Sequence, residues 1–134
     1  MVKSGIRPQV LLSTLWVFVL LNMIFRDLHQ LGHPGFIEEM MSGVINGVKI
    51  TDELMLLGGF LAEIPIIMVL LSRILGETSN KWANIIASVI TLLVLISAFP
   101  SADMDDIFFM IIEVIALVAI IRIAWILPSW GNTE

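Results

Sequence analysis

Two glutamates are the residues best suited to chemistry, because each lies within a long apolar stretch of the chain. Glu63 and Glu113 are about ten and about eight residues inside the starts of these stretches, and a helical rise of 1.5 Å per residue puts both roughly 12–15 Å deep. A charged carboxylate at the bilayer centre costs about 2.5–3.5 kcal/mol on insertion scales. We therefore expect both side chains to face the protein interior, uncharged unless a cation pairs with them.

Polar residues of the first apolar stretch are placed to meet these glutamates. Asn22, Arg26 and His29 follow one another at spacings of four and three, so they share one helix face. Asn22 reaches the depth of the glutamates, and the long side chain of Arg26 can point towards them. We expect a cluster of Asn22, Arg26, Glu63 and Glu113. It is either a site for a proton, a cation or a polar headgroup, or a buried network that only specifies helix pairing.

A proline lies two residues after the first of these glutamates. Pro65 has no backbone donor, so it should kink its helix and free the carbonyl of Leu61 beside Glu63. A broken helix next to an acid is an arrangement that transporters use to hold ions, although a lone kink is also common in membrane helices.

At the opposite end, Arg73 and Asn84 should form an inner polar layer with lipid as its partner.

Other chemistry finds little support in the sequence. The chain has no cysteine, which excludes disulfides and thiolate chemistry, and no basic tract for nucleic acid. His29 and His33 have the spacing of metal ligands on a helix, but Gly32 and Pro34 interrupt that helix, so we predict no metal site. No catalytic set, phosphate-binding loop or cofactor motif is found, which favours a protein that is not an enzyme.

The elements that position these residues are membrane helices. The chain of 134 residues is 58% hydrophobic and 14% charged, with a mean hydropathy of +1.00, whereas soluble domains have about 25% charged residues. Four stretches reach the roughly 20 residues that a spanning helix needs, at about 9–28, 52–75, 81–99 and 103–127. We predict an all-α fold, a four-transmembrane-helix antiparallel bundle in one domain, in which the last three helices pack in sequence.

Residues at the helix ends support these boundaries. Thr51, either Ser79 or Asn80, and Asp103 can cap the starts of the second, third and fourth helices. Pro100 and Pro128 should close the third and fourth.

The long connector between the first two helices has a pattern of its own. Apolar residues of the range 35–48 recur at helical spacing and predict a short amphipathic helix. It either lies in the outer headgroup layer or forms a lid over the mouth of the bundle.

The basic residues indicate the orientation in the membrane. Lys3, Arg7, Arg73, Lys81 and Arg122 fall on one side, and only Arg26 and Lys49 on the other. By the positive-inside rule both termini are cytoplasmic, which suits a multi-pass protein of the inner (plasma) membrane. Three tryptophans should form an aromatic belt at the cytoplasmic interface: Trp82, Trp125 and Trp130.

Several short runs resemble a known group of proteins. They are Leu21-Asn22-Met23-Ile24-Phe25-Arg26-Asp27, Glu63-Ile64-Pro65, Lys81-Trp82-Ala83-Asn84-Ile85, and Phe108-Phe109 with Glu113-Val114. Together they resemble an uncharacterised family of small four-helix prokaryotic membrane proteins, distantly similar to DoxX-like proteins. The resemblance implies a four-helix membrane bundle without an assigned activity. It also implies that Asp27, Glu63, Asn84 and Glu113 are the matching polar positions, which adds Asp27 to the candidate site.

Three functions stay open at this point. The first is small-solute transport coupled to a proton or cation, through the buried carboxylates. The second is a non-catalytic accessory or assembly subunit of a membrane complex. The third is a quinone- or lipid-linked membrane enzyme. The expected partners are membrane lipids and a second copy of the chain, since small bundles often associate.

Overall fold

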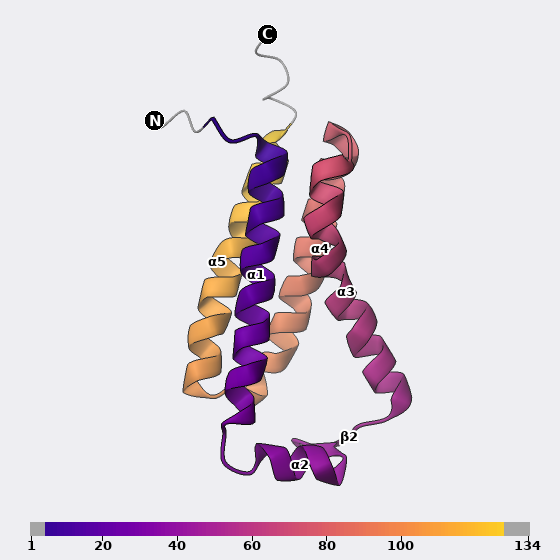
Figure 1. Cartoon of the computed structure of the whole chain (residues 1–134), viewed down its shortest axis with the longest axis vertical. Helices are drawn as coiled ribbons and strands as arrows, with labels where there is room; N and C mark the ends of the chain where they lie inside the picture. The colour runs from indigo at the N-terminus through magenta and orange to yellow at the C-terminus, as the bar shows by residue number, and fades with distance from the viewer. Residues whose placement is uncertain (1–4, 128–134) are drawn as a thin grey trace.

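The computed structural model describes residues 5–127 and is built almost wholly from helices (Figure 1). The elements in chain order are α1 (Pro8–Leu31), α2 (Phe36–Ser42), β1 (Val44–Ile45), β2 (Val48–Lys49), α3 (Asp52–Ile74), α4 (Glu77–Ala98), the 3-10 helix η1 (Phe99–Ser101) and α5 (Met104–Ile126). Four of these helices, α1, α3, α4 and α5, are long and apolar enough to cross a membrane. The predicted all-α class is confirmed.

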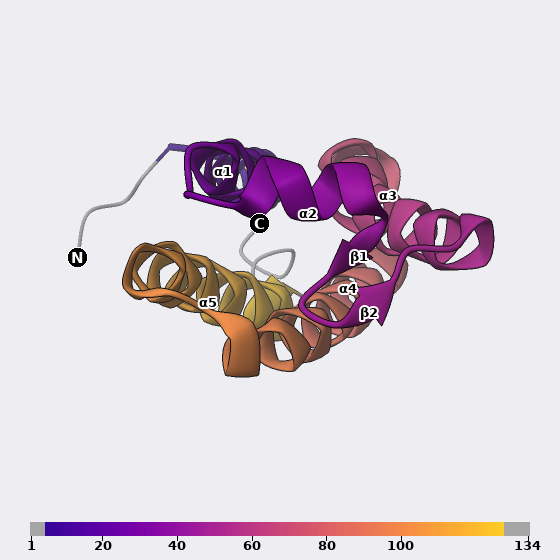
Figure 2. The same cartoon turned by 90° about the horizontal axis from the view of Figure 1, so that it is seen from below.

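The four long helices form a ring. α1 and α4 each pack against both α3 and α5, so α1 lies diagonally opposite α4, and α3 diagonally opposite α5 (Figure 2). Short turns join α3 to α4 and α4 to α5, so these neighbours are antiparallel, as expected. This order decides which polar residues can meet.

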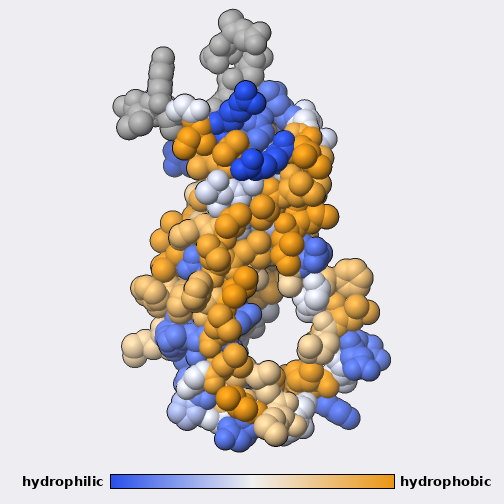
Figure 3. Space-filling view, in the orientation of Figure 1, coloured by the Kyte–Doolittle hydropathy of each residue, from blue (hydrophilic) through white to orange (hydrophobic). Residues whose placement is uncertain are grey.

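The surface of the bundle is suited to lipid. Large apolar side chains on its outer faces are open, such as Phe60 at 67% and Leu93 at 62% exposure. Hydrophobic residues cover the middle of the molecule, and hydrophilic ones gather towards its two ends (Figure 3). Water would leave this apolar surface uncovered, whereas hydrocarbon covers it without cost. The chain is therefore a multi-pass membrane protein.

Two of the three expected helix caps are found. The backbone N–H of Leu54 donates to the Thr51 hydroxyl at the start of α3, and Asp103 is the N-cap of α5. The prediction for α4 was wrong, because this helix begins one turn earlier, after Gly76. Asn80 is therefore a buried residue inside the helix and does not cap it. Pro100 lies in η1, directly after α4, while Pro128 lies outside the described residues.

The connector after α1 differs from the expected helix over 35–48. α2 ends at Ser42, because Gly43 adopts a left-handed φ of 74° that stops a helix. Asn46 and Gly47 then take φ values of 50° and 78°, which is the turn chemistry of a two-residue hairpin, and β1 pairs with β2. The Asn46-Gly47 pair in the sequence indicates this turn. The expected helix was wrong because it was continued through these two residues.

α3 changes direction near its middle, where Pro65 lies. Its first half leans away from the other long helices, and its second half runs beside them (Figure 1). Proline leaves the Leu61 carbonyl without its helical donor, which is the usual cause of such a bend. In the space-filling view an opening remains beside the first half of α3 (Figure 3). Pro65 itself is buried.

Candidate functional site: a carboxylate pocket between α1 and α5

The centre of the candidate site is an ion pair between α1 and α5. Arg26 Nη1 lies 3.1 Å from Glu113 Oε2. The Glu113 side chain is 1% exposed and that of Arg26 is 15% exposed. The antiparallel packing of α1 and α5 brings the two residues to one level, as expected for this pair. Removing a carboxylate from water is expensive, so the attraction to Arg26 mainly offsets the cost of burying Glu113.

Further polar contacts join the same two helices, nearer to their outer ends. Asp106 lies two helical turns before Glu113 on the same face of α5 and is 4% exposed. Its Oδ2 accepts a hydrogen bond of 2.8 Å from Gln30 Nε2. A ladder of polar pairs therefore follows the contact between α1 and α5 from the interior towards the surface.

Two histidine–aspartate pairs complete this ladder at the surface. His29 Nδ1 lies 2.6 Å from Asp105 Oδ2, and His33 Nε2 lies 3.1 Å from Asp103 Oδ2. Each histidine is thus paired with a single carboxylate. Among residues 5–127, no group of three or more His, Cys, Asp and Glu side chains is arranged to hold a metal ion.

Two carboxylate oxygens in the ladder are unsatisfied. Glu113 Oε1 and Asp106 Oδ1 are buried and have no hydrogen-bond partner among the described residues. A buried acceptor without a donor costs about 1–3 kcal/mol. Most buried polar atoms in folded proteins are paired, so an unpaired one needs a functional or structural reason.

A pocket of about 310 Å³ lies beside these groups. Arg26, Asp27 and Asp106 line it from α1 and α5. Phe36 and Ile45, from α2 and β1, line another side and are half-buried there. The α2–hairpin segment therefore forms part of the wall of the pocket.

The charges around this carboxylate pocket do not balance. Arg26 is the one guanidinium among its described neighbours, and it is 3.1 Å from Glu113 and 4.0 Å from Asp27. Asp106 adds a third carboxylate. One cation facing three acids favours the uptake of a proton, a cation or another hydrogen-bond donor.

Two members of the expected cluster lie apart from this pocket. Glu63 is exposed on α3, diagonally across the ring from α5, and its side chain has no hydrogen bond or ion pair within the described chain. Asn22 is half-buried, and its Nδ2 donates to the carbonyl of Phe18, one turn earlier on α1. The structure therefore does not turn Glu63 and Glu113 towards each other.

The sequence interpretation missed Asp106 and Gln30. A usable signal existed, because Asp106 and Glu113 are seven residues apart and share one helix face. The partner helix could not be read from the sequence.

The inner half holds a second polar cluster, centred on Asn84. Asn84 Oδ1 accepts from Trp16 Nε1 at 2.7 Å and from Ser72 Oγ at 3.2 Å. Asn84 Nδ2 donates to the carbonyl and the Oδ1 of Asn80, at 2.9 and 2.6 Å. These side chains are fully buried and come from α1, α3 and α4. We call them the Asn84 network. It holds three helices together.

Arg73, the other expected inner residue, is exposed and lies next to this network. Its Nε donates to Ser13 Oγ at 3.2 Å, and that hydroxyl donates to the carbonyl of Val69. Close by, Lys81 Nζ stands 4.2 Å from the ring centre of Trp125, which meets Trp82 edge to face. Two of the three expected belt tryptophans thus lie together, and Trp130 lies outside the described residues.

A comparison with family models finds one match, described as "Family of unknown function (DUF6326)", over residues 3–134. No curated protein and no solved structure matches the chain. The match agrees with the resemblance to an uncharacterised family and does not bear on the likeness to DoxX-like proteins.

Proposed function

The chain belongs to this family of unknown function, and we propose that it is a transport protein that couples a small solute to a proton or cation through the carboxylate pocket between α1 and α5. The observation that carries the proposal is the state of Glu113. Its carboxylate is buried, one oxygen is paired with Arg26, and the other has no partner among the described residues. Most buried polar atoms in folded proteins have a partner, so an open acceptor is unusual for an acid that serves packing alone.

The charge around the pocket suggests how coupling would work. A proton or cation that reaches Glu113 competes with Arg26 for the carboxylate. Arg26 then has a second partner close by, because its Nε is already 4.0 Å from Asp27. Two alternative pairings of one guanidinium form a simple two-state element, which is what coupling requires.

The orientation follows from the basic residues and is part of the proposal. Both termini face the cytoplasm, since five of the seven Lys and Arg residues lie at that end. The carboxylate pocket then opens near the outer surface of the inner membrane. A solute from outside meets the histidine–aspartate pairs first and Glu113 last.

The chain offers a matched pair of substitutions to test this proposal. Glu113→Gln and Glu63→Gln make the same chemical change in two apolar helices, and only Glu113 pairs with Arg26, which lines the pocket. We expect proteoliposomes to show pH-dependent flux of protons or small cations that Glu113→Gln reduces by about tenfold or more, while Glu63→Gln changes it less than twofold. Flux that is absent from the wild type would count against transport, and flux that is equal in both variants would count against a role of Glu113 in it.

An accessory or assembly subunit is the second candidate function. The fully bonded Asn84 network favours it, because such a network specifies helix packing without needing a ligand. In this case Glu113→Gln would change thermal stability and leave the response to every small cation unchanged. Melting curves of the two glutamine variants, with and without added cations, separate the two functions.

A further inference from the structure

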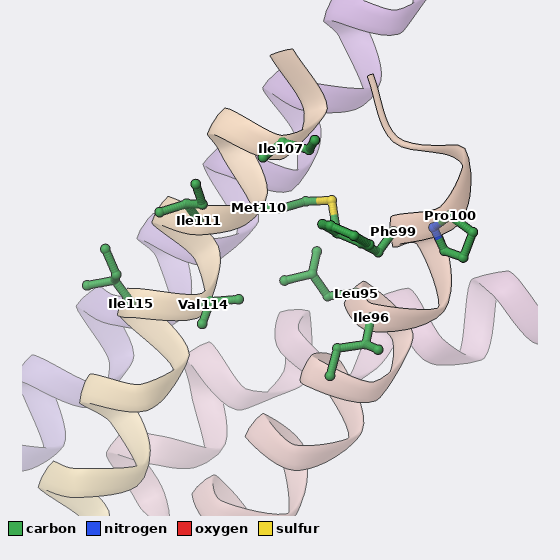
Figure 4. A pocket seen from close by; sticks show the side chains of 9 residues that line it. All are labelled: Leu95, Ile96, Phe99, Pro100, Ile107, Met110, Ile111, Val114 and Ile115. Carbon is green, nitrogen blue, oxygen red and sulfur yellow. The ribbon is translucent and has the colours of Figure 1, made fainter. Parts of the chain in front are cut away.

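An apolar groove of about 470 Å³ lies along α5. It is on a different side of this helix from the face that carries Asp106 and Glu113. It runs between the end of α4, continued by η1, and the first half of α5 (Figure 4). Its wall consists almost wholly of aliphatic and aromatic side chains, including Leu95, Phe99, Ile107, Met110, Ile111 and Val114. Several of these side chains are open to the surrounding hydrocarbon, so a ligand can enter from the lipid.

Met110 separates this apolar groove from the carboxylate pocket. It lines both, and it is 6% exposed. Figure 4 shows its thioether directed towards Phe99, in the groove. Methionine is unbranched and adapts its shape easily, so it is a soft wall between two spaces.

Neighbouring residues of α5 contribute in turn to the polar ladder and to the apolar groove, so these two surfaces lie side by side. Asp106 and Glu113 belong to the ladder facing α1, and the residues that follow each of them, Ile107 and Val114, line the groove. A molecule that passes Met110 would therefore meet carboxylates at one end and apolar side chains along its length.

We propose that the carboxylate pocket and the apolar groove together bind an amphiphile with an ammonium headgroup and an apolar chain. The headgroup lies at Asp106 in the carboxylate pocket, and the chain crosses Met110 into the groove. This inference rests on the proposed function and names the substrate class of the same site.

Charge complementarity favours an ammonium headgroup over other lipid headgroups. The carboxylates of Asp27 and Asp106 line the pocket, and they repel a phosphate or a fatty-acid carboxylate. An ammonium group supplies N–H donors, and the unpartnered oxygen Asp106 Oδ1, on a residue that lines the pocket, is the acceptor it needs.

The test compares three probes in nanodiscs of zwitterionic lipid: methylammonium, decylammonium and decanoate. We expect decylammonium to bind about tenfold or more tightly than methylammonium, and decanoate not to bind. Ile111→Trp fills the groove from an exposed position, with little risk to folding. It should weaken decylammonium at least about fivefold and leave methylammonium unchanged.

Matched variants separate the chain from the headgroup. Leu93→Trp adds the same side chain to an exposed position outside the groove, and it should change nothing. Asp106→Asn should weaken both ammonium probes, because it removes the charge of a carboxylate that lines the pocket.

Each contrary outcome has a distinct meaning. Equal binding of both ammonium probes, unaffected by Ile111→Trp but lost in Asp106→Asn, overturns the inference and leaves the proposed function standing. Decanoate binding as tight as decylammonium overturns the ammonium preference and so the inference. If Asp106→Asn affects neither ammonium probe, the headgroup does not lie in the pocket and the inference fails, while the flux of Glu113→Gln still decides the proposed function.

Discussion

Glu113 and Asn84 are both buried polar residues, but their hydrogen bonding differs. The amide of Asn84 has bonds at both its oxygen and its nitrogen, to three other side chains and a carbonyl. Glu113 has one oxygen bonded and one free among the described residues. Since complete bonding suits a structural role, and an open acceptor suits binding, we propose that Asn84 serves stability and Glu113 serves function.

The Asn84 assignment predicts a loss of stability. Asn84→Ala leaves Trp16 Nε1 and Ser72 Oγ without their acceptor, which should lower the free energy of unfolding by about 1–3 kcal/mol. Unfolding in detergent, followed by tryptophan fluorescence, measures this. Thr14→Ala is the control, because it removes an exposed hydroxyl bonded within its own helix. A loss no larger than that of the control would contradict a structural role.

At the scale of elements, the bend in α3 sets apart the two glutamates that the sequence suggested as a pair. α3 lies diagonally across the ring from α5, and its first half leans away from the bundle (Figure 1). Glu63 is therefore exposed, while Glu113 is enclosed between α1 and α5. Pro65 is the local cause of the bend, because it breaks the helical hydrogen-bond ladder.

Restoring that hydrogen bond should straighten the helix. Pro65→Ala returns a donor to the Leu61 carbonyl, so the first half of α3 should move towards α4. Spin labels on Leu56→Cys and Leu93→Cys, both exposed sites, should then lie closer together. Labels on Leu70→Cys and Ile86→Cys, beyond the bend, serve as the control pair. An unchanged Leu56–Leu93 distance would mean that packing, and not the proline, bends α3.

At the scale of the whole molecule, the two ends of the bundle differ in chemistry. One end has Arg73 beside Ser13, and Lys81 over Trp125. The other end has the acidic ladder and the α2–hairpin segment. This polarity supports the proposed orientation, with the acidic end outside. A second copy of the chain as partner stays a prediction, which native mass spectrometry would test.

Cysteine labelling can test the orientation cleanly, because the chain has no cysteine of its own. Glu38→Cys lies on α2, and Thr78→Cys lies near the turn between α3 and α4; both sites are exposed. In whole cells an impermeant maleimide should label Glu38→Cys at once and Thr78→Cys only after the membrane is opened. The reverse order would invert the topology and move the carboxylate pocket to the cytoplasmic side.

The sequence alone determined the four membrane helices, most of their ends and the residues able to do chemistry. Hydrophobic length and capping are local properties of the sequence. For this reason the expected caps of α3 and α5, Thr51 and Asp103, agree with the structure. The pairing of Arg26 with Glu113 was also foreseen. Only the tertiary structure decided that Asp106 joins this pair and that Glu63 does not. Such choices depend on the order of the helices in the ring and on the bend at Pro65, and no spacing along one chain encodes these.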